Sequence, residues 1–430
     1  MKNDRQDGLK FLRKRVRDLS SLIEVSRVVN STLDLAKLLD ITMKIARKVM
    51  RAEASSLMLI DEGTNELVYE VALGKKGKEI KKMFRLKMGQ GIAGWVAKNK
   101  RPLLVKDVSK DPRFFNRPDK TTGFKTRSIL CVPMKVKDKT IGILEAINPL
   151  GRSAFNNEDT DLFNAFASQA AVAIVNARMH NQMMEKQRVE QELAVASQIQ
   201  QNFLPRVYPK SNGISIYAQS IPAREIGGDF YDFLKLDNDS LAIAIGDVSG
   251  KGVPAALYMV KAMTELRNHA SEFSGPDEVL SAVNNILVKE SMRGMFVTLL
   301  YTILNFRNRT ITFSNAGHLS PMLLDVPSKK IIPLNEARNI PLGIAPGIKY
   351  DKAELDLRGD KLLTLYTDGI IEARNNRAKE FGIQRLKEVM RRKNLSAKSA
   401  VNSIIREVSD FSKGVLQHDD LTILAARIRN

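Results

Sequence analysis

The stretch LAIAIGDVSGKG, residues 241–252, joins an unbroken apolar run to a carboxylate and a glycine-rich turn. The apolar residues from Leu241 to Ile245 predict a buried β-strand, which Gly246 and Asp247 end. Asp247 therefore reaches the edge of a sheet while its neighbours stay buried. A single aspartate in this position is usually a turn former, so further motifs are needed to assign a chemistry.

Three other motifs of the second half share this design. LLTLYTDG (362–369) repeats the apolar strand and ends at Asp368, and GGDFYD (227–232) places Asp229 where a strand begins. HDD (418–420) stands directly before another apolar strand. If these four aspartate positions converge, the carboxylates repel one another unless cations neutralise them. The set therefore predicts a metal site, although spacing alone does not show that the four positions meet.

The ligand types narrow the metal and the reaction. The candidates are carboxylates, backbone carbonyls and water, in a chain with 1 cysteine and 4 histidines. Such hard oxygen donors favour Mg²⁺ or Mn²⁺ over Zn²⁺. Two such ions about 3.5–4 Å apart can bridge a water, lower its pKa and stabilise an in-line displacement at phosphorus. The second half therefore reads as a two-metal phosphate-ester hydrolase.

Around these motifs the pattern alternates between runs of strands and pairs of helices. Strands are expected at 214–220, 229–236, 241–247, 296–306, 310–315, 321–324, 361–367 and 421–428, and helices at 253–270, 276–290, 382–393 and 397–413. This grouping favours an α+β fold over a βαβ repeat.

The first half predicts a separate small domain between helices. Helices are expected within 8–50, with a break at 30–32, and strands at 54–60, 67–71, 102–105, 128–136 and 140–148. A long amphipathic helix follows from about Glu158 and continues through 177–204 without Gly or Pro. This extension is either one long surface helix or a signalling helix that pairs with its twin in a homodimer. We favour pairing, because a polar helix of this length is hard to stabilise alone.

Composition excludes several classes of protein. The 430 residues contain no apolar run of the ~18–20 residues that span a bilayer, and the charged N-terminus is unlike a secretory signal peptide. The lone Cys131 excludes a disulfide framework and is expected in the core. A cytoplasmic, multidomain protein that does not enter the membrane is therefore expected.

The net charge of +20 suggests nucleic acid as a partner. Residues 1–200 hold 37 basic and 23 acidic residues, a surplus of 14, which leaves a surplus of 6 for the rest. No zinc-finger spacing or basic tail accompanies the surplus, so a solvated basic surface is the preferred interpretation and nucleic-acid binding the alternative.

Two glycine-rich strings have the wrong context for nucleotide binding. GQGIAG (89–94) matches GxGxxG, but a half-basic stretch precedes it and Asn99 and Pro102 cut the next helix short. GDVSGKG (246–252) lacks the four-residue gap of a P-loop and has Gly252 where a hydroxyl should reach magnesium.

Five motifs follow one another in the second half: GGDFYD, GDVSGKG, NAGH (315–318), YTDGIIEA (366–373) and HDDLT (418–422). In this order they resemble the SpoIIE/RsbU branch of PPM-type serine/threonine phosphatases, and the resemblance covers about 190–430. The resemblance implies an α-β-β-α sandwich with two metal ions, Mn²⁺ or Mg²⁺, between the sheets. The implied substrate is a phosphoserine or phosphothreonine, commonly on a STAS-domain anti-sigma-factor antagonist, and direct attack by a metal-bridged water is expected.

The family's carboxylates carry over onto specific residues. The implied catalytic metal ligands are Asp229, Asp247, Asp368 and Asp419, and the Val248 carbonyl is a further metal ligand. Asp420 is the alternative to Asp419. The implied supporting positions are Gly228, Gly250, His318 and Gly369. Asp247 would bridge both metals. Arg224 is either a phosphate-binding counterpart or an exposed loop arginine. His318 is either a proton donor or, as we prefer, a turn-stabilising residue with Asn315.

The first half resembles a GAF domain over about 25–178, through GQGIAGWVA (89–97), SILCVPM (128–134) and IGILEAIN (141–148). GAF pockets bind various small molecules or none, and the ligand here is not identified. The expected order is an N-terminal helix (1–24), a GAF sensor (25–178), a coiled-coil signalling linker (179–210) and a phosphatase domain (211–430). We expect a homodimer formed through the N-terminal helix, the GAF domain and the linker. The linker would set the first phosphatase helix and the turn at 250–254. The alternative is an inactive PPM fold that only binds partners.

Overall fold

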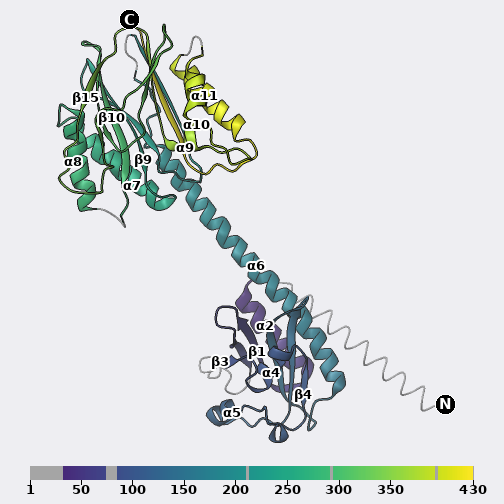
Figure 1. The fold of residues 1–430 in the computed structure, drawn as a ribbon. Coiled ribbons are helices and arrows are strands. Elements are labelled where there is room, and N and C mark those ends of the chain that lie inside the picture. Colours follow the sequence, from purple (N-terminus) through teal and green to yellow (C-terminus); the bar gives the residue numbers. More distant parts are fainter. Residues whose placement is uncertain (1–31, 74–84, 210–212, 291–293, 393–395, 430) are drawn as a thin grey trace. The chain divides into compact units, whose positions relative to one another are not determined.

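The structure is a computed structural model that describes residues 32–73, 85–209, 213–290, 294–392 and 396–429. The chain divides into two compact units, residues 1–188 and 189–430, whose elements are labelled in Figure 1. The N-terminal helix expected at 1–24 lies outside the described residues.

The N-terminal unit is built on a six-stranded sheet in the order β3-β2-β1-β6-β5-β4, with every neighbouring pair antiparallel. The strands are β1 (Ala52–Asp61), β2 (Glu66–Leu73), β3 (Arg85–Lys87), β4 (Leu103–Val105), β5 (Ile129–Val136) and β6 (Lys139–Pro149). The five strands expected from the sequence are present. The edge strand β3 was not expected, because two of its three residues are basic and exposed.

Helices cover both faces of this sheet. One face packs against α2 (Leu35–Met50) and the first part of α6 (Asn157–Gln201), and the other against α4 (Gly91–Asn99). Two short turns of helix, η1 (Val108–Lys110) and α5 (Arg117–Thr122), complete the unit. Cys131 is fully buried in the apolar cluster beside α4, as expected. The GQGIAG string opens α4 after an antiparallel edge strand, so the expectation that it does not belong to a βαβ unit is confirmed.

Helix α6 begins in the N-terminal unit and ends in the C-terminal unit. Its first part is anchored by buried residues from Phe163 to Ala177. Beyond them the helix continues without a break, and Met179, Met183 and Ile199 are more than half exposed. The expected long helix is confirmed, and no end of secondary structure falls at residue 178.

The C-terminal unit contains two sheets. One has the order β14-β11-β10-β9-β8, with β15 also paired to β11, and the other has the order β13-β12-β16-β17-β7. The first is formed by β8 (Phe230–Lys235), β9 (Ser240–Val248), β10 (Val297–Asn305), β11 (Thr310–Ala316), β14 (Arg338–Asn339) and β15 (Ala353–Asp356). The second is formed by β7 (Ile214–Ile221), β12 (Met322–Asp325), β13 (Ile331–Pro333), β16 (Lys361–Tyr366) and β17 (Leu421–Ile428).

Helices lie outside the two sheets, as Figure 1 shows. The β9–β10 face packs against α7 (Val253–His269) and α8 (Pro276–Lys289), and the β16–β17 face against α10 (Gly382–Met390) and α11 (Ala397–Phe411). A third apolar cluster, with Ile243 and Leu424 fully buried, fills the space between the sheets. The unit is therefore the expected α-β-β-α sandwich, and the one-turn helix α9 (Asp368–Glu372) follows β16.

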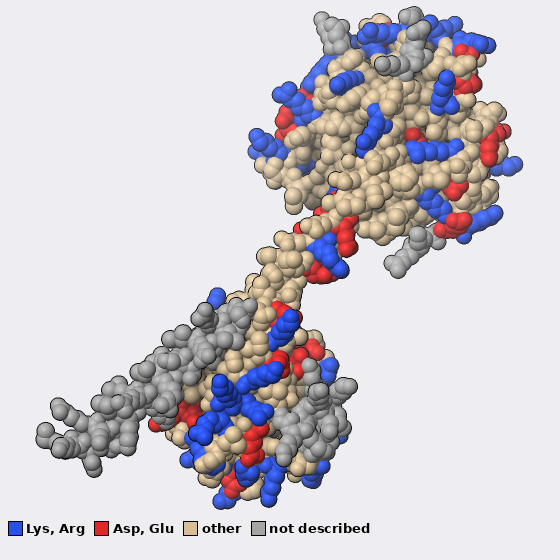
Figure 2. All heavy atoms as spheres, turned by 180° about the vertical axis from the view of Figure 1, so that it is seen from behind, with Lys and Arg blue, Asp and Glu red and all other residues tan. Residues whose placement is uncertain are grey.

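No helix among the described residues is both long and apolar enough to cross a bilayer. On the face of the C-terminal unit seen in Figure 2, Lys and Arg side chains are interspersed with Asp and Glu. That face therefore carries a mixed charged surface rather than a continuous basic one.

Candidate metal centre

The first two aspartates come from neighbouring strands of one sheet. Asp247 is the penultimate residue of β9, and Asp229 directly precedes β8. The two strands pair with Phe230 opposite Gly246, which places Asp229 and Asp247 side by side at one sheet end. The apolar run of β9 is buried throughout, so packing of the run fixes where the Asp247 carboxylate emerges.

The other aspartates come from the second sheet. Asp368 begins α9 immediately after β16, and Asp419 and Asp420 immediately precede β17. Strands β16 and β17 are antiparallel neighbours with Tyr366 opposite Ile423. The end of one strand therefore lies beside the start of the other, which brings the two motifs together.

The electrostatics show that carboxylates of both sheets approach one another. Burial, and then the charges of Asp368 and Asp419, raise the pKa of Asp247 to about 7. Burial, followed by Asp247 and Asp420, raises the pKa of Asp229 well above its usual range. Burial and Asp419 also raise the pKa of Asp368. Mutual repulsion of this kind is expected where several carboxylates share one site without a counterion.

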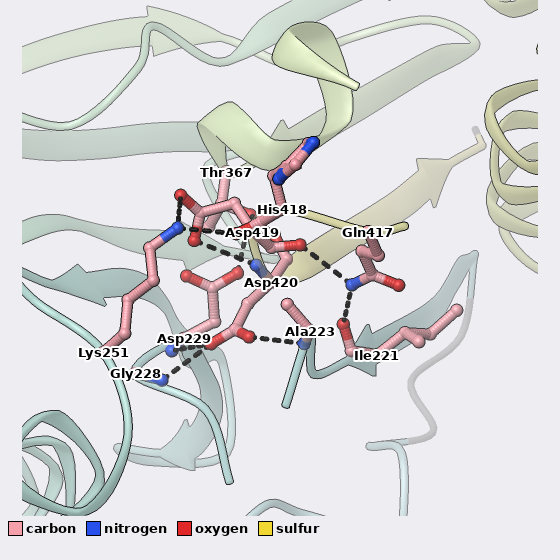
Figure 3. Close-up of polar contacts among 10 residues, drawn as sticks. All are labelled: Ile221, Ala223, Gly228, Asp229, Lys251, Thr367, Gln417, His418, Asp419 and Asp420. Atoms are coloured by element: carbon pink, nitrogen blue, oxygen red, sulfur yellow. Dashed lines mark hydrogen bonds and ion pairs between the residues drawn. The ribbon is translucent and has the colours of Figure 1, made fainter. Parts of the chain in front are cut away.

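The carboxylate of Asp420 is held by backbone N–H groups, and no side chain of the described residues donates to it. Its carboxylate accepts N–H groups of Ala223 at 2.8 Å and Gly228 at 2.7 Å, with a longer contact of 3.4 Å from Asp229 (Figure 3). These bonds tie the GGD segment to the start of β17. Asp420 is therefore occupied, whereas Asp419 points to the other side of the chain, toward Lys251.

Lys251 is a residue of the centre that the sequence interpretation missed. Its ammonium lies 2.8 Å from an Asp419 carboxylate oxygen and donates to the His418 carbonyl at 2.6 Å (Figure 3). It belongs to the GDVSGKG motif, in which the sequence interpretation singled out Asp247, Val248 and Gly250 but not the lysine. Gly250, immediately before it, has φ +96°, a backbone conformation that residues with a side chain rarely adopt. Glycine at this position therefore allows the turn that leads to Lys251.

Thr367 is a second missed residue. Its hydroxyl donates to the Asp229 carboxylate at 2.7 Å, so it orients a carboxylate of the opposite sheet. The neighbouring Gly369 must lack a side chain, because a Cβ there would collide with the Asp420 carbonyl oxygen. Gly228 similarly faces the Val248 carbonyl oxygen, which a Cβ would approach to 3.1 Å.

The donor set fits divalent cations in chemistry and charge. Only oxygen donors meet here, and they carry an excess of negative charge that cations would relieve. As the side chains stand, no three His, Cys, Asp or Glu of the described part of the chain are arranged to hold an ion. Asp419 is engaged by Lys251 and Asp229 by Thr367, so binding would require at least Asp419 to exchange its partner.

Two other predicted residues form no hydrogen bond or ion pair with these carboxylates in the described part of the chain. His318 is buried, with its Nδ1 atom 2.9 Å from the Thr298 hydroxyl, and Asn315 bonds both its N–H and its carbonyl. Burial lowers the pKa of His318 to about 4, so its ring is neutral at pH 7 and is not the imidazolium that would protonate a leaving group. Arg224 is exposed and makes no ion pair with any residue that the structure describes.

The end of α6 contacts the centre directly. The Gln200 side-chain amide donates to the Gly227 carbonyl at 2.6 Å and accepts the Gly227 N–H at 3.2 Å. Gly227 is two residues before Asp229. Sequence periodicity could not reveal this contact, because Gln200 looks like any polar residue of a surface helix.

Comparisons with known proteins agree with this geometry. A family model described as Stage II sporulation protein E (SpoIIE) matches residues 237–429, and a GAF domain model matches residues 34–174. Phosphoserine phosphatase RsbU of Bacillus subtilis is 30% identical over 247 residues, which cover 56% of this chain and 71% of RsbU. Protein IcfG of Synechocystis is 32% identical over 262 residues, 54% of this chain and 41% of IcfG.

Among solved structures, the SiaA-PP2C domain of Pseudomonas aeruginosa is similar at 21% identity and a TM-score of 0.50. The match covers 57% of this chain and 98% of that domain. At this identity the likeness concerns the fold, and it identifies the C-terminal sandwich as PP2C-like.

Proposed function

Because the chain belongs to the SpoIIE/RsbU family of PPM-type phosphatases and carries a GAF domain, we propose that its C-terminal unit dephosphorylates phosphoserine or phosphothreonine on a partner protein. The observation that carries this proposal is the meeting of carboxylates from both sheets, where burial and then the charges of Asp368 and Asp419 raise the pKa of Asp247 to about 7. An acidic site with only oxygen donors suits a cation-dependent phosphate-ester hydrolase. A module that only binds partners would have no need to keep such a repulsive cluster.

In this proposal Asp229, Asp247, Asp368 and Asp419 hold two Mn²⁺ or Mg²⁺ ions, with the Val248 carbonyl as a further ligand. When bound, such ions supply a nucleophile at neutral pH and neutralise charge at the phosphoryl group. The protein's own groups position the ligands: Thr367 orients Asp229, and Asp420 fixes the backbone that carries it. Asp419 is the proposed ligand of the HDD motif, because the carboxylate of Asp420 is already occupied by backbone N–H groups.

The test is hydrolysis of a phosphoserine peptide by the full chain with Mn²⁺, with Mg²⁺ and with EDTA. We expect turnover with either cation, none with EDTA, and loss of turnover in Asp247→Asn. The matched control is Asp356→Asn, an exposed aspartate of the edge strand β15, which should retain wild-type activity. A folded wild-type protein that binds Mn²⁺ but releases no phosphate would favour the inactive partner-binding module instead.

The substrate that we propose is a phosphorylated STAS-domain protein of the kind that RsbU-type phosphatases act on. Incubation of the full chain with phosphorylated STAS proteins and Mn²⁺, followed by mass spectrometry, tests this step. Release of phosphate from peptides but from none of the STAS proteins would retain the phosphatase and reject this substrate class.

For regulation we propose that the chain forms a homodimer through its long helix. Exposed apolar residues Met183, Val189 and Ile199 of α6 support this proposal. Their position on the helix that also carries Gln200 would link pairing of the helices to the segment before Asp229. Light scattering of the full chain tests the dimer, and Val189→Lys should weaken it. A monomeric wild-type protein at micromolar concentration would refute the dimer but not the phosphatase.

A further inference from the structure

A pocket of about 710 Å³ opens directly beside the carboxylate centre. Its walls come from α9, from α11 and from the segment 412–419 that leads into β17. Asp419, Lys251 and Gly369 line this pocket and also belong to the centre. A molecule bound in the pocket would therefore lie next to a phosphoryl group held at the centre.

Apolar residues line one side of the pocket. Ile405 and Val408 of α11 and Leu421 of β17 contribute to its lining. At the rim, Leu416 is 87% exposed, more than any other large apolar residue of the described chain. Contiguous exposed apolar patches mark interaction sites, and Leu416 extends the apolar lining of this pocket out to the surface.

The exposed position of Leu416 is held in place by its neighbour. The Gln417 side-chain amide donates to the Ile221 carbonyl at 2.9 Å and to the Asp419 carbonyl at 2.8 Å (Figure 3). These bonds tie the rim to β7 and to the centre. Leu416 is therefore presented on an anchored segment, and little conformational entropy is lost when something packs against it.

The charges of the pocket favour an acidic occupant. Lys251, Arg374 and Lys413 line it against Glu372 and Asp419. Arg374 is paired with Glu380 at 3.0 Å, whereas Lys413 has no hydrogen bond or ion pair with any residue that the structure describes. Lys413 is exposed and available to an incoming carboxylate.

We propose that this pocket binds the segment of the substrate protein that flanks the phosphorylated residue. This proposal rests on the phosphatase function proposed above. The preferred segment has an apolar side chain that packs against Leu416 and an acidic side chain near Lys413. The continuity of the pocket with the centre favours this occupant over a second copy of the chain, because a substrate segment bound there would place its phosphorylated residue beside Asp419.

The test compares phosphoserine peptides in which leucine is moved through the two positions on either side of the phosphoserine, each matched to an alanine peptide. For the full chain with Mn²⁺, kcat/KM for the best leucine peptide should exceed that of its alanine match about tenfold, the effect of burying one apolar side chain. In Leu416→Ser this preference should disappear. Each value is divided by kcat/KM for p-nitrophenyl phosphate, which has no flanking residues.

Two variants complete this comparison. Val207→Ser is the matched control, because Val207 is 83% exposed in the same unit and lies outside the pocket lining. It should keep the tenfold leucine preference. Lys413→Glu should lower the ratio for peptides with a glutamate beside the phosphoserine and raise it for peptides with a lysine there.

A second readout is independent of turnover. Binding of a fluorescein-labelled peptide with a non-hydrolysable phosphonate in place of the phosphoserine is followed by anisotropy, and Leu416→Ser should weaken it about tenfold. If neither p-nitrophenyl phosphate nor any peptide is hydrolysed, the proposed function fails, and anisotropy still decides whether the pocket binds. Equal kcat/KM and equal binding in wild type and Leu416→Ser would overturn the inference. Dissociation of a dimer by Leu416→Ser in sedimentation velocity would also overturn it, by assigning the pocket to a second copy.

Discussion

Replacing Asp420 by alanine tests the proposal that Asp420 is a structural carboxylate and that Asp419 is the metal ligand. Asp420 accepts the N–H groups of Ala223 at 2.8 Å and Gly228 at 2.7 Å. Hydrogen bonds to a charged group contribute about 1.5–3 kcal/mol each, so losing both costs roughly 3–6 kcal/mol. The same substitution removes repulsion from Asp229 and Asp247, which offsets part of that cost. We therefore expect the free energy of unfolding of the C-terminal unit to fall by about 3 kcal/mol.

Scanning calorimetry of the full chain without added metal measures this loss. For a domain of this size, about 3 kcal/mol corresponds to a midpoint roughly 6–12 °C lower. The single tryptophan, Trp95, lies on α4 of the N-terminal unit. Its fluorescence therefore reports the other unit, whose transition should not shift, and serves as an internal reference.

Asp419→Ala is the matched comparison. The Asp419 side chain is 41% exposed and its partner Lys251 is 43% exposed. An ion pair with this exposure contributes about 1 kcal/mol or less. We expect a nearly unchanged midpoint but a large loss of Mn²⁺ affinity in calorimetric titration. If Asp419→Ala lowers the midpoint as far as Asp420→Ala and still binds Mn²⁺ normally, the two roles have been exchanged and the reasoning is refuted.

Three further predictions follow from contacts of single residues. The substitution Thr367→Val removes the hydroxyl that donates to Asp229 at 2.7 Å. It should cost about 1 kcal/mol of stability and weaken Mn²⁺ binding in the same titration. Unchanged affinity would show that the bond does not position a ligand. The substitution Lys251→Met removes the ammonium that competes with the cation for Asp419. If that ion pair contributes about 1 kcal/mol, Mn²⁺ affinity should rise about fivefold. A decrease in affinity would mean that Lys251 assists binding. Burial raises the pKa of Glu145 above its ordinary 4.5, so the stabilising protonated form is lost as the pH rises above that value. The tryptophan-monitored unfolding midpoint of the wild type should therefore fall relative to Glu145→Gln between pH 4.5 and 8, and a constant difference would contradict the shift.

The strands and the aspartates that end them could be predicted because both depend on local sequence. The run Leu241–Ile245 is apolar without a break, and the structure buries all of it in β9. Asp247 and Asp368 follow such runs, so their place at strand ends was fixed by the apolar pattern. Short strands were missed because they carry no such apolar pattern: β14, which pairs with β11, has only the two polar residues Arg338–Asn339.

The partners of those aspartates could not be predicted, because they depend on contacts between distant segments. Thr367 reaches Asp229 across 138 positions of sequence, and Lys251 reaches Asp419 across 168. Asp419 and Asp420 are chemically identical neighbours, and what distinguishes them are the backbone N–H groups around Asp420 and the contact of Asp419 with Lys251. Gln200 is likewise an ordinary polar helix residue until its two bonds to Gly227 are seen.

The carboxylate centre is assembled against its own electrostatics. Burial and repulsion raise the pKa of Asp247 to about 7, so at pH 7 about half of the metal-free molecules keep a proton there that the unfolded chain would release. The buried apolar layer between the sheets, with Ile243 and Leu424, keeps the strand ends together despite this cost. A divalent cation that binds the assembled centre, as proposed, and not the unfolded chain would stabilise the C-terminal unit in proportion to the logarithm of its concentration above Kd. The proposal therefore links metal binding to the stability of this unit, and a substitution that alters one must be read against the other.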